Sequence, residues 1–170
     1  MVSVDDYPPL DAVVSLGPGR KAVDIVKYIL GVIREDWEPS NVNGTTPVVE
    51  FSESMKAVRF SSGDFITLYT LSQTTEPVSL VYDFVNETIT FSIDMFTSVS
   101  REHLIKLYEE VRRAILKHRR DTIPISEGLT GRMWMEWEIR SSPFEKTGKN
   151  FYRRTVDCRV NWRYRHIKIE

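Results

Sequence analysis

The chain has 170 residues, 41% of them apolar and 28% charged, with a formal net charge of −1. These values predict one globular domain with a hydrophobic core, and they exclude an intrinsically disordered chain and a strongly basic polyanion binder. No apolar run is long enough to cross a bilayer, and the single cysteine, Cys158, excludes an intrachain disulfide and a cysteine zinc site.

The first 18 residues are predicted to form an extended N-terminal arm in front of a single domain over residues 19–170. Pro8 and Pro9 restrict the backbone of this segment, and Gly17 loosens it near its end. A packed element is therefore not expected there.

Charge is distributed unevenly between the two ends of the chain. Residues 151–170 hold six basic and two acidic residues, whereas residues 1–20 hold one arginine and three aspartates, Asp5, Asp6 and Asp11. Ends of opposite sign fit a subunit that contacts copies of itself or a charged partner. The alternative is that both ends are simply solvated.

Apolar residues three and four positions apart predict a first helix that begins at Arg20. It should end before Pro39, because proline disfavours helical backbone in the residue before it. Residues 38–47 are rich in asparagine, glycine, serine and proline, and this composition predicts a surface loop.

Strands are predicted over residues 57–60 and 65–72, and as two segments around a turn near Asn86 within residues 78–96. The last segment alternates with a period of two, which predicts a half-buried strand. Its two faces are Ile89, Phe91, Ile93 and Met95 on one side, and Thr88, Thr90, Ser92 and Asp94 on the other.

A second helix is predicted to begin at Ser100, a favourable N-cap residue. Glu109 and Arg113 are spaced to pair on its surface. The basic residues 117–120 are attributed to favourable electrostatics at the helix end, with phosphate binding as the alternative. The apolar face of this helix is Leu104, Leu107, Tyr108, Val111 and Ile115.

A long hairpin is predicted from residues 132–140 and 150–167, which both alternate. Glu136 and Glu138 share the charged face of the first strand and are expected to pair with Arg153 or Arg159 across the ladder. The inward face of the second strand is predicted to hold Tyr152, Arg154, Val156, Cys158, Val160, Trp162 and Tyr164.

The order of these elements predicts an α+β fold: a single antiparallel-dominated, mixed β-sheet with two helices packed on one face, plus the extended N-terminal arm. Each helix has one apolar stripe, and burying both stripes against one sheet face satisfies the pattern.

No catalytic, cofactor or metal site is expected. His103, His118 and His166 lack the spacing of zinc ligands, and no nucleophile motif or phosphate loop is present. A metal-dependent nuclease using Glu136 and Glu138 is the weakest alternative, because structural pairing with arginines explains these glutamates better.

Six pieces of the sequence carry a resemblance to a known family. They are "REDW" at residues 34–37, then "TPVVEF", "FITLYTL", "TITFSIDMFTSVSREHL", "EEVRRAILKHRRD" and "FYRRTVDCRV". In the order and texture of these pieces, residues 20–167 resemble the tail terminator proteins of long-tailed phages and tailed archaeal viruses, also described as tail completion or head–tail joining proteins. None of the pieces is a catalytic signature, and the first 18 residues are not covered.

The resemblance implies a virion protein without enzymatic activity or cofactor. Such proteins form a ring, usually of six subunits, that stops polymerisation of the tail tube and meets the connector of a filled head. The implied partners are further copies of the chain, the tail tube protein and the head-completion protein, with DNA passing through the lumen without specific binding. Assembly is expected in the host cytoplasm, with no membrane partner, and another head–tail connector role is an open alternative.

The expected contact residues come from the charged ends of the chain and from loops 38–48 and 141–150. They are Asp5, Asp6, Asp11, Asn41, Asn43, Lys146, Lys149, Arg163 and Arg165. The alternative function is a nucleic-acid-binding module that uses the basic face of the C-terminal hairpin, where Arg153, Arg159, Arg163 and Arg165 lie with Trp134 beside them.

Overall fold

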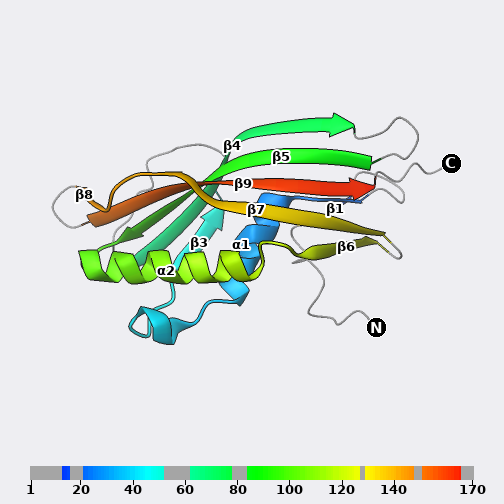
Figure 1. The fold of residues 1–170 in the computed structure, drawn as a ribbon. Coiled ribbons are helices and arrows are strands. Elements are labelled where there is room, and N and C mark those ends of the chain that lie inside the picture. The colour runs from blue at the N-terminus through cyan, green and yellow to red at the C-terminus, as the bar shows by residue number, and fades with distance from the viewer. Residues whose placement is uncertain are drawn as a thin grey trace.

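The computed structural model describes residues 13–15, 21–51, 62–77, 84–126, 129–147 and 151–165. Within them the fold is α+β, and its main sheet has seven strands (Figure 1). The strand order is β3-β4-β5-β9-β7-β6, with β8 paired to β9; β3 is parallel to β4 and the other ladders are antiparallel. This confirms the predicted fold class. The strands are β3 (Val48–Phe51), β4 (Asp64–Pro77), β5 (Phe84–Thr97), β6 (Thr122–Ser126), β7 (Leu129–Ser141), β8 (Glu145–Thr147) and β9 (Phe151–Arg165).

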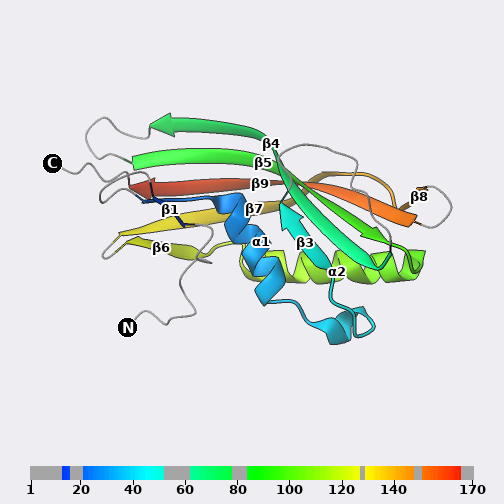
Figure 2. The same ribbon diagram turned by 180° about the vertical axis from the view of Figure 1, so that it is seen from behind.

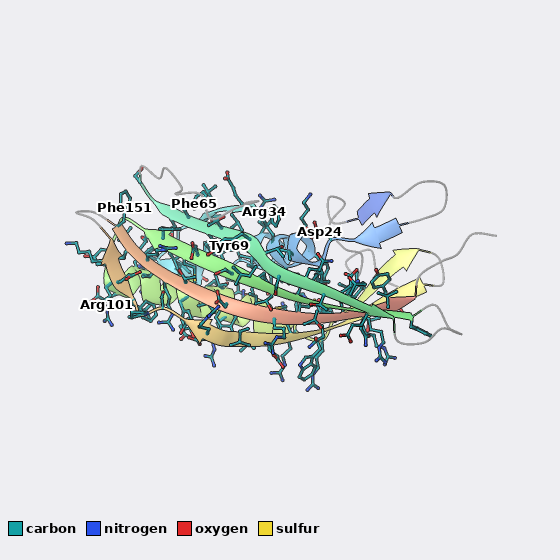
Figure 3. The ribbon with its side chains drawn as sticks, turned by 90° about the horizontal axis from the view of Figure 1, so that it is seen from above. Asp24, Arg34, Phe65, Tyr69, Arg101 and Phe151 are labelled. Atoms are coloured by element: carbon teal, nitrogen blue, oxygen red, sulfur yellow. The ribbon has the colours of Figure 1, made fainter. Side chains whose placement is uncertain are left out.

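The N-terminal region differs from the prediction. A short antiparallel ladder joins β1 (Val13–Ser15) to β2 (Lys21–Val23), so part of the predicted arm is a strand. The first helix, α1 (Ile25–Glu35), begins after Asp24 and not at Arg20. The reason is local: the Asp24 carboxylate accepts hydrogen bonds from the amides of Val26 and Lys27 at 3.2 Å each, which caps the helix there (Figure 3). Residues 1–12, with Asp5, Asp6 and Asp11, lie outside the described residues.

The second helix, α2 (Arg101–Lys117), begins as predicted. Ser100 is its N-cap, and the Ser100 hydroxyl accepts from the His103 amide at 3.1 Å. All five residues of its predicted apolar face are buried. No helix in the described part of the chain is long and apolar enough to span a membrane.

Both helices pack against the same face of the main sheet. α1 crosses the strands near the middle of the molecule and α2 runs beneath them (Figure 2). A single apolar cluster joins the two helices to β4, β5, β7 and β9. Cys158 is fully buried within it, as predicted, and burial raises the pKa of its thiol to about 12. The opposite face of the sheet is called the outer face below.

The strand β5 is continuous through the turn predicted near Asn86, so that prediction is wrong. Residues 84–97 pair with β9 in one unbroken register, because the neighbouring strand supplies ladder partners on both sides of Asn86. The predicted buried face is confirmed. On the other face, however, Ser92 and Asp94 are also buried: Ser92 donates to Asp157 at 2.8 Å, and Asp94 accepts from Arg153 at 2.9 Å.

Of the first two predicted strands, one is longer than predicted and the other lies outside the described residues. The predicted strand over residues 65–72 is present but extends to Pro77 as β4, and the sequence did not indicate β3, which pairs in parallel with its first half. The strand predicted over residues 57–60 lies outside the described residues.

A bulge in β7 overturns the prediction that Glu136 and Glu138 share a face. The register with β9 shifts between Glu136 and Arg140, and Glu138 has a φ of 54°. Glu138 consequently points to the helix side, where it accepts from Tyr108 and Arg154 at 2.6 Å each. Glu136 stays on the outer face and pairs with Arg159 at 3.2 Å, as predicted. The glutamates diverge, which removes the geometric basis of the nuclease alternative.

Candidate partner-binding surfaces

The loop over residues 38–48 is held in one conformation by buried groups of α2. It contains the short 3-10 helix η3 (Pro39–Val42). The Glu38 amide donates to Glu110 Oε1 at 2.9 Å, and Asn41 Nδ2 donates to Glu110 Oε2 at 2.8 Å. The Trp37 indole donates to the carbonyl of Thr45 at 3.0 Å and closes the loop on itself.

Glu110 is the buried anchor of this loop. Its side chain is 1% exposed and forms an ion pair with Arg113 at 2.6 Å, while Arg113 also pairs with Asp36 at 3.1 Å. The predicted Glu109–Arg113 pair is therefore wrong: Glu109 pairs with Arg112, and Arg113 turns toward the end of α1. Burial opposes ionisation of Glu110, but hydrogen bonds from Arg113, Asn41 and Glu38 outweigh it and lower its pKa.

Replacing Glu110 with glutamine is expected to reduce the free energy of unfolding by about 1.5–3 kcal/mol at neutral pH, the net worth of hydrogen bonds to a charged group. Because the pKa of Glu110 is lowered by folding, its stabilisation is full above the ordinary glutamate pKa of 4.5 and is lost as the pH falls through the lowered value. Urea titrations between pH 3 and pH 7 should thus show the two proteins converging in acid. A constant difference across this range, or an equal loss in the exposed control Glu109→Gln, would contradict the assignment.

A second buried polar group fixes the other half of the loop. His103 Nε2 lies 2.7 Å from Asp64 Oδ2, and both side chains are about 2–3% exposed. The hydroxyl groups of Thr45 and Thr97 also donate to Asp64, at 2.8 and 2.7 Å. The carboxylate of Asp64 therefore accepts from one donor each of the loop, β5 and α2.

Asn43 connects this buried group to the surface. Lys106 donates to Asn43 Oδ1 at 2.6 Å, which orients the amide so that Nδ2 donates to His103 Nδ1 at 3.1 Å. His103 then carries its proton on Nε2 and donates it to Asp64. Asn43 itself has left-handed backbone with a φ of 52°, a conformation that asparagine tolerates better than most residues. The sequence prediction missed His103 and Asp64, since they are 39 residues apart in the chain.

The contact residues predicted from the sequence lie at separate places on the molecule. Asn41 and Asn43 are exposed on the loop below α2, but their amides are engaged by Glu110 and His103. Lys146 is exposed on β8, at the opposite end of the sheet from the C-terminal end of β9 (Figure 1). Arg163 lies near that C-terminal end and is exposed. Arg165 ends β9, and Lys149 lies outside the described residues.

The second half of β4 is an exposed sheet edge. β3 pairs only with Phe65–Leu68, so from Tyr69 onward β4 has a neighbour on one side alone in the described part of the chain. Every residue from Thr70 to Glu76 is exposed. In Figure 1 this part of β4 forms the upper border of the sheet, well beyond the end of α2. An edge of this length presents unpaired backbone donors and acceptors to another chain.

The opposite edge of the sheet is better protected. It is formed by β6, which carries Pro124 and therefore lacks one backbone donor, and β2 lies beside β6. The two edges of the main sheet thus differ in their ability to accept a further strand.

No protein-family model matches the chain, and no curated protein matches it significantly. The open β4 edge, the anchored loop and the outer face are therefore the observations that bear on function.

Proposed function

We propose that this protein is a ring-forming structural subunit of a viral tail, which caps the tail tube, ends its polymerisation and meets the head connector. The open β4 edge supports this proposal most directly, and the sequence resemblance to tail terminator proteins selects the ring among possible assemblies. In this proposal the protein acts in the virion without enzymatic activity, and its partners are five or so further copies of itself, the tail tube protein and the head-completion protein.

The difference between the two sheet edges supports a ring over a dimer. If two identical β4 edges paired with each other, the contact would be isologous and would close at two subunits. A ring requires a heterologous contact, in which the edge of one subunit meets a different surface of the next. The open edge and the protected β6 side give one subunit two unlike lateral surfaces.

The anchored loop is suited to an axial contact with the tube or the connector. Its tip exposes Ser40, Gly44 and Thr46, and Val48 at its end is 53% exposed. Glu110 nevertheless holds the Glu38 backbone amide, and His103 holds the Asn43 side chain. A loop that is already ordered loses little conformational entropy on binding. The segment around Lys146 lies at one end of the sheet and offers a separate surface for the other partner.

The biological role is tested by removing the gene from its virus and measuring tails by electron microscopy. We expect tails of uncontrolled length that carry no head, because nothing ends tube polymerisation. Tails of normal length joined to heads would overturn the proposal.

Adding charge to the β4 edge is expected to prevent self-association without unfolding the subunit. Gln73 and Thr74 are both exposed, so the double variant Gln73→Lys/Thr74→Lys should change the free energy of unfolding by less than about 1 kcal/mol. Like charges on an edge strand oppose pairing with another chain. Sedimentation velocity should show loss of the oligomer. The matched control, Glu102→Gln/Glu109→Gln, raises the net charge by the same amount on α2 and should remain oligomeric. Loss of the oligomer in both variants would contradict the assignment of the contact to the β4 edge.

A further inference from the structure

We propose that the outer face carries a groove that binds single-stranded nucleic acid, with two arginines on the phosphates and a tryptophan against a base. This site goes beyond the ring-forming role, and of the residues that line it only Glu76 belongs to the β4 edge. It also differs from the expectation that DNA passes without binding.

The groove has a volume of about 360 Å³ and lies between β4, β5, β9 and β7. These strands extend past the end of α2 (Figure 1). Two adjacent cross-strand rows form its floor. One row places Asn86, Arg163 and Arg132 side by side, and the next places Thr88, Asn161 and Trp134 side by side.

No carboxylate among the described residues forms an ion pair with the two arginines of this groove. Arg132 and Arg163 are directly opposite each other on β7 and β9, an arrangement that destabilises a sheet unless an anion lies between or above the two charges. Arg163 donates through Nε to Asn86 at 2.8 Å, and within the described part of the chain its terminal nitrogens and the whole Arg132 guanidinium have no partner. Glu76 lines the groove but forms no ion pair with the described residues.

Three arginines nearer the start of β9 are different. Arg153 pairs with Asp94 at 2.9 Å, Arg154 with Glu138 at 2.6 Å, and Arg159 with Glu136 at 3.2 Å. Carboxylates therefore neutralise these three arginines, whereas Arg163 at the groove forms no ion pair with a described residue. The proposed site accordingly leaves out Arg153 and Arg159, which the sequence-based alternative included.

Trp134 supplies the aromatic surface. It is 41% exposed and lines the groove, and the guanidinium of Arg120 lies 4.2 Å from its ring centroid. A tryptophan on a sheet face, flanked by cations and by the amides of Asn86 and Asn161, matches the chemistry that stacks an unpaired base and holds the adjoining phosphates. A duplex cannot present an unpaired base to it, so the proposed ligand is single-stranded.

The test is fluorescence anisotropy of a labelled 15-nucleotide oligo(dT) with the full chain at 50 and 200 mM salt. We expect binding that weakens with salt, since about two phosphates are neutralised. Trp134→Ala should weaken binding about 5- to 100-fold with an unchanged salt slope. Arg132→Gln/Arg163→Gln should weaken it and reduce the slope by roughly 1.4, the value for two contacts on a single strand.

The control Arg101→Gln/Arg112→Gln removes the same charge from α2 and should leave binding unchanged. Circular dichroism melts show whether each variant is folded. Absence of binding at 50 mM salt, equal binding of a duplex of the same length, or wild-type affinity in the Trp134 and double arginine variants would each overturn the proposal. None of these results bears on the ring, which is measured with the β4 edge variants.

Discussion

Replacing His103 with alanine is expected to reduce the free energy of unfolding by about 3 kcal/mol, the upper end of the range for a hydrogen bond to a charged group, because the change also leaves a buried cavity. A larger loss is not expected, because Thr45 and Thr97 still donate to Asp64 after His103 is lost. The substitution also removes the acceptor of the Asn43 amide, so the loop over residues 38–48 should exchange its amide hydrogens faster. Urea unfolding and hydrogen exchange measure the two effects.

Two controls test whether the loss of stability comes from the contact between His103 and Asp64 and not from general damage to α2. Arg112→Ala breaks an exposed ion pair with Glu109 and should change the free energy of unfolding by less than about 1 kcal/mol. In an Asp64→Asn background, the cost of His103→Ala should fall, because the buried carboxylate to which His103 donates is gone. An equal cost in both backgrounds would show that the Asp64 contact is not the cause.

Replacing Gly131 with alanine is expected to cost about 3 kcal/mol, the upper end of the range for overpacking a core. A Cβ atom at this position would lie 2.0 Å from Cη2 and 2.3 Å from Cζ2 of Trp162, whose side chain is 1% exposed. The indole is a rigid ring held between the sheet and the core, so it cannot yield as a flexible chain end would. Chemical denaturation measures the loss.

A smaller side chain at position 162 tests whether the clash with Trp162 causes the loss of stability in Gly131→Ala. In a Trp162→Phe background the ring no longer reaches as far, so Gly131→Ala should cost less than it does beside tryptophan. Thr130→Ala, at an exposed neighbouring position, is the matched control and should have an effect below about 0.5 kcal/mol. Additive effects of the Gly131 and Trp162 changes would contradict the predicted clash.

Elements whose signals are local were predictable from the sequence. Ser100 caps α2 through its own side chain, and the buried faces of α2 and β5 repeat at the periods of a helix and a strand. The same holds for β9, whose inward residues Val156, Cys158, Val160 and Trp162 are buried. In each case the determining residues are within a few positions of one another.

The features that the sequence did not predict depend on partners distant in the chain. In the β7 bulge four residues of β7 span two of β9, which alternation cannot reveal, and Glu138 consequently points to the helix side, where Tyr108 and Arg154 donate to it. The parallel pairing of β3 with β4 likewise depends on how distant segments of the chain come together. A turn near Asn86 was suggested by local composition, but the ladder with β9 overrides that preference.

In the candidate surfaces, too, local features were predictable and contacts between residues distant in the chain were not. Asn41 and Asn43 were identified as loop residues, and the structure places them on an exposed loop. That their amides bind Glu110 and His103, 69 and 60 residues away, could not be read from loop composition. The placement of Arg132 opposite Arg163 was equally hidden, because it depends on the register between β7 and β9.

The central claim, that the chain assembles into a closed ring through the β4 edge, is tested most directly by light scattering on the full-length protein across a range of concentrations. We expect wild-type protein to reach a defined mass of several chains, with six as the number that the resemblance implies, and Gln73→Lys/Thr74→Lys to remain at the mass of one chain. Wild-type protein that stays at the mass of one chain at every concentration would contradict the account.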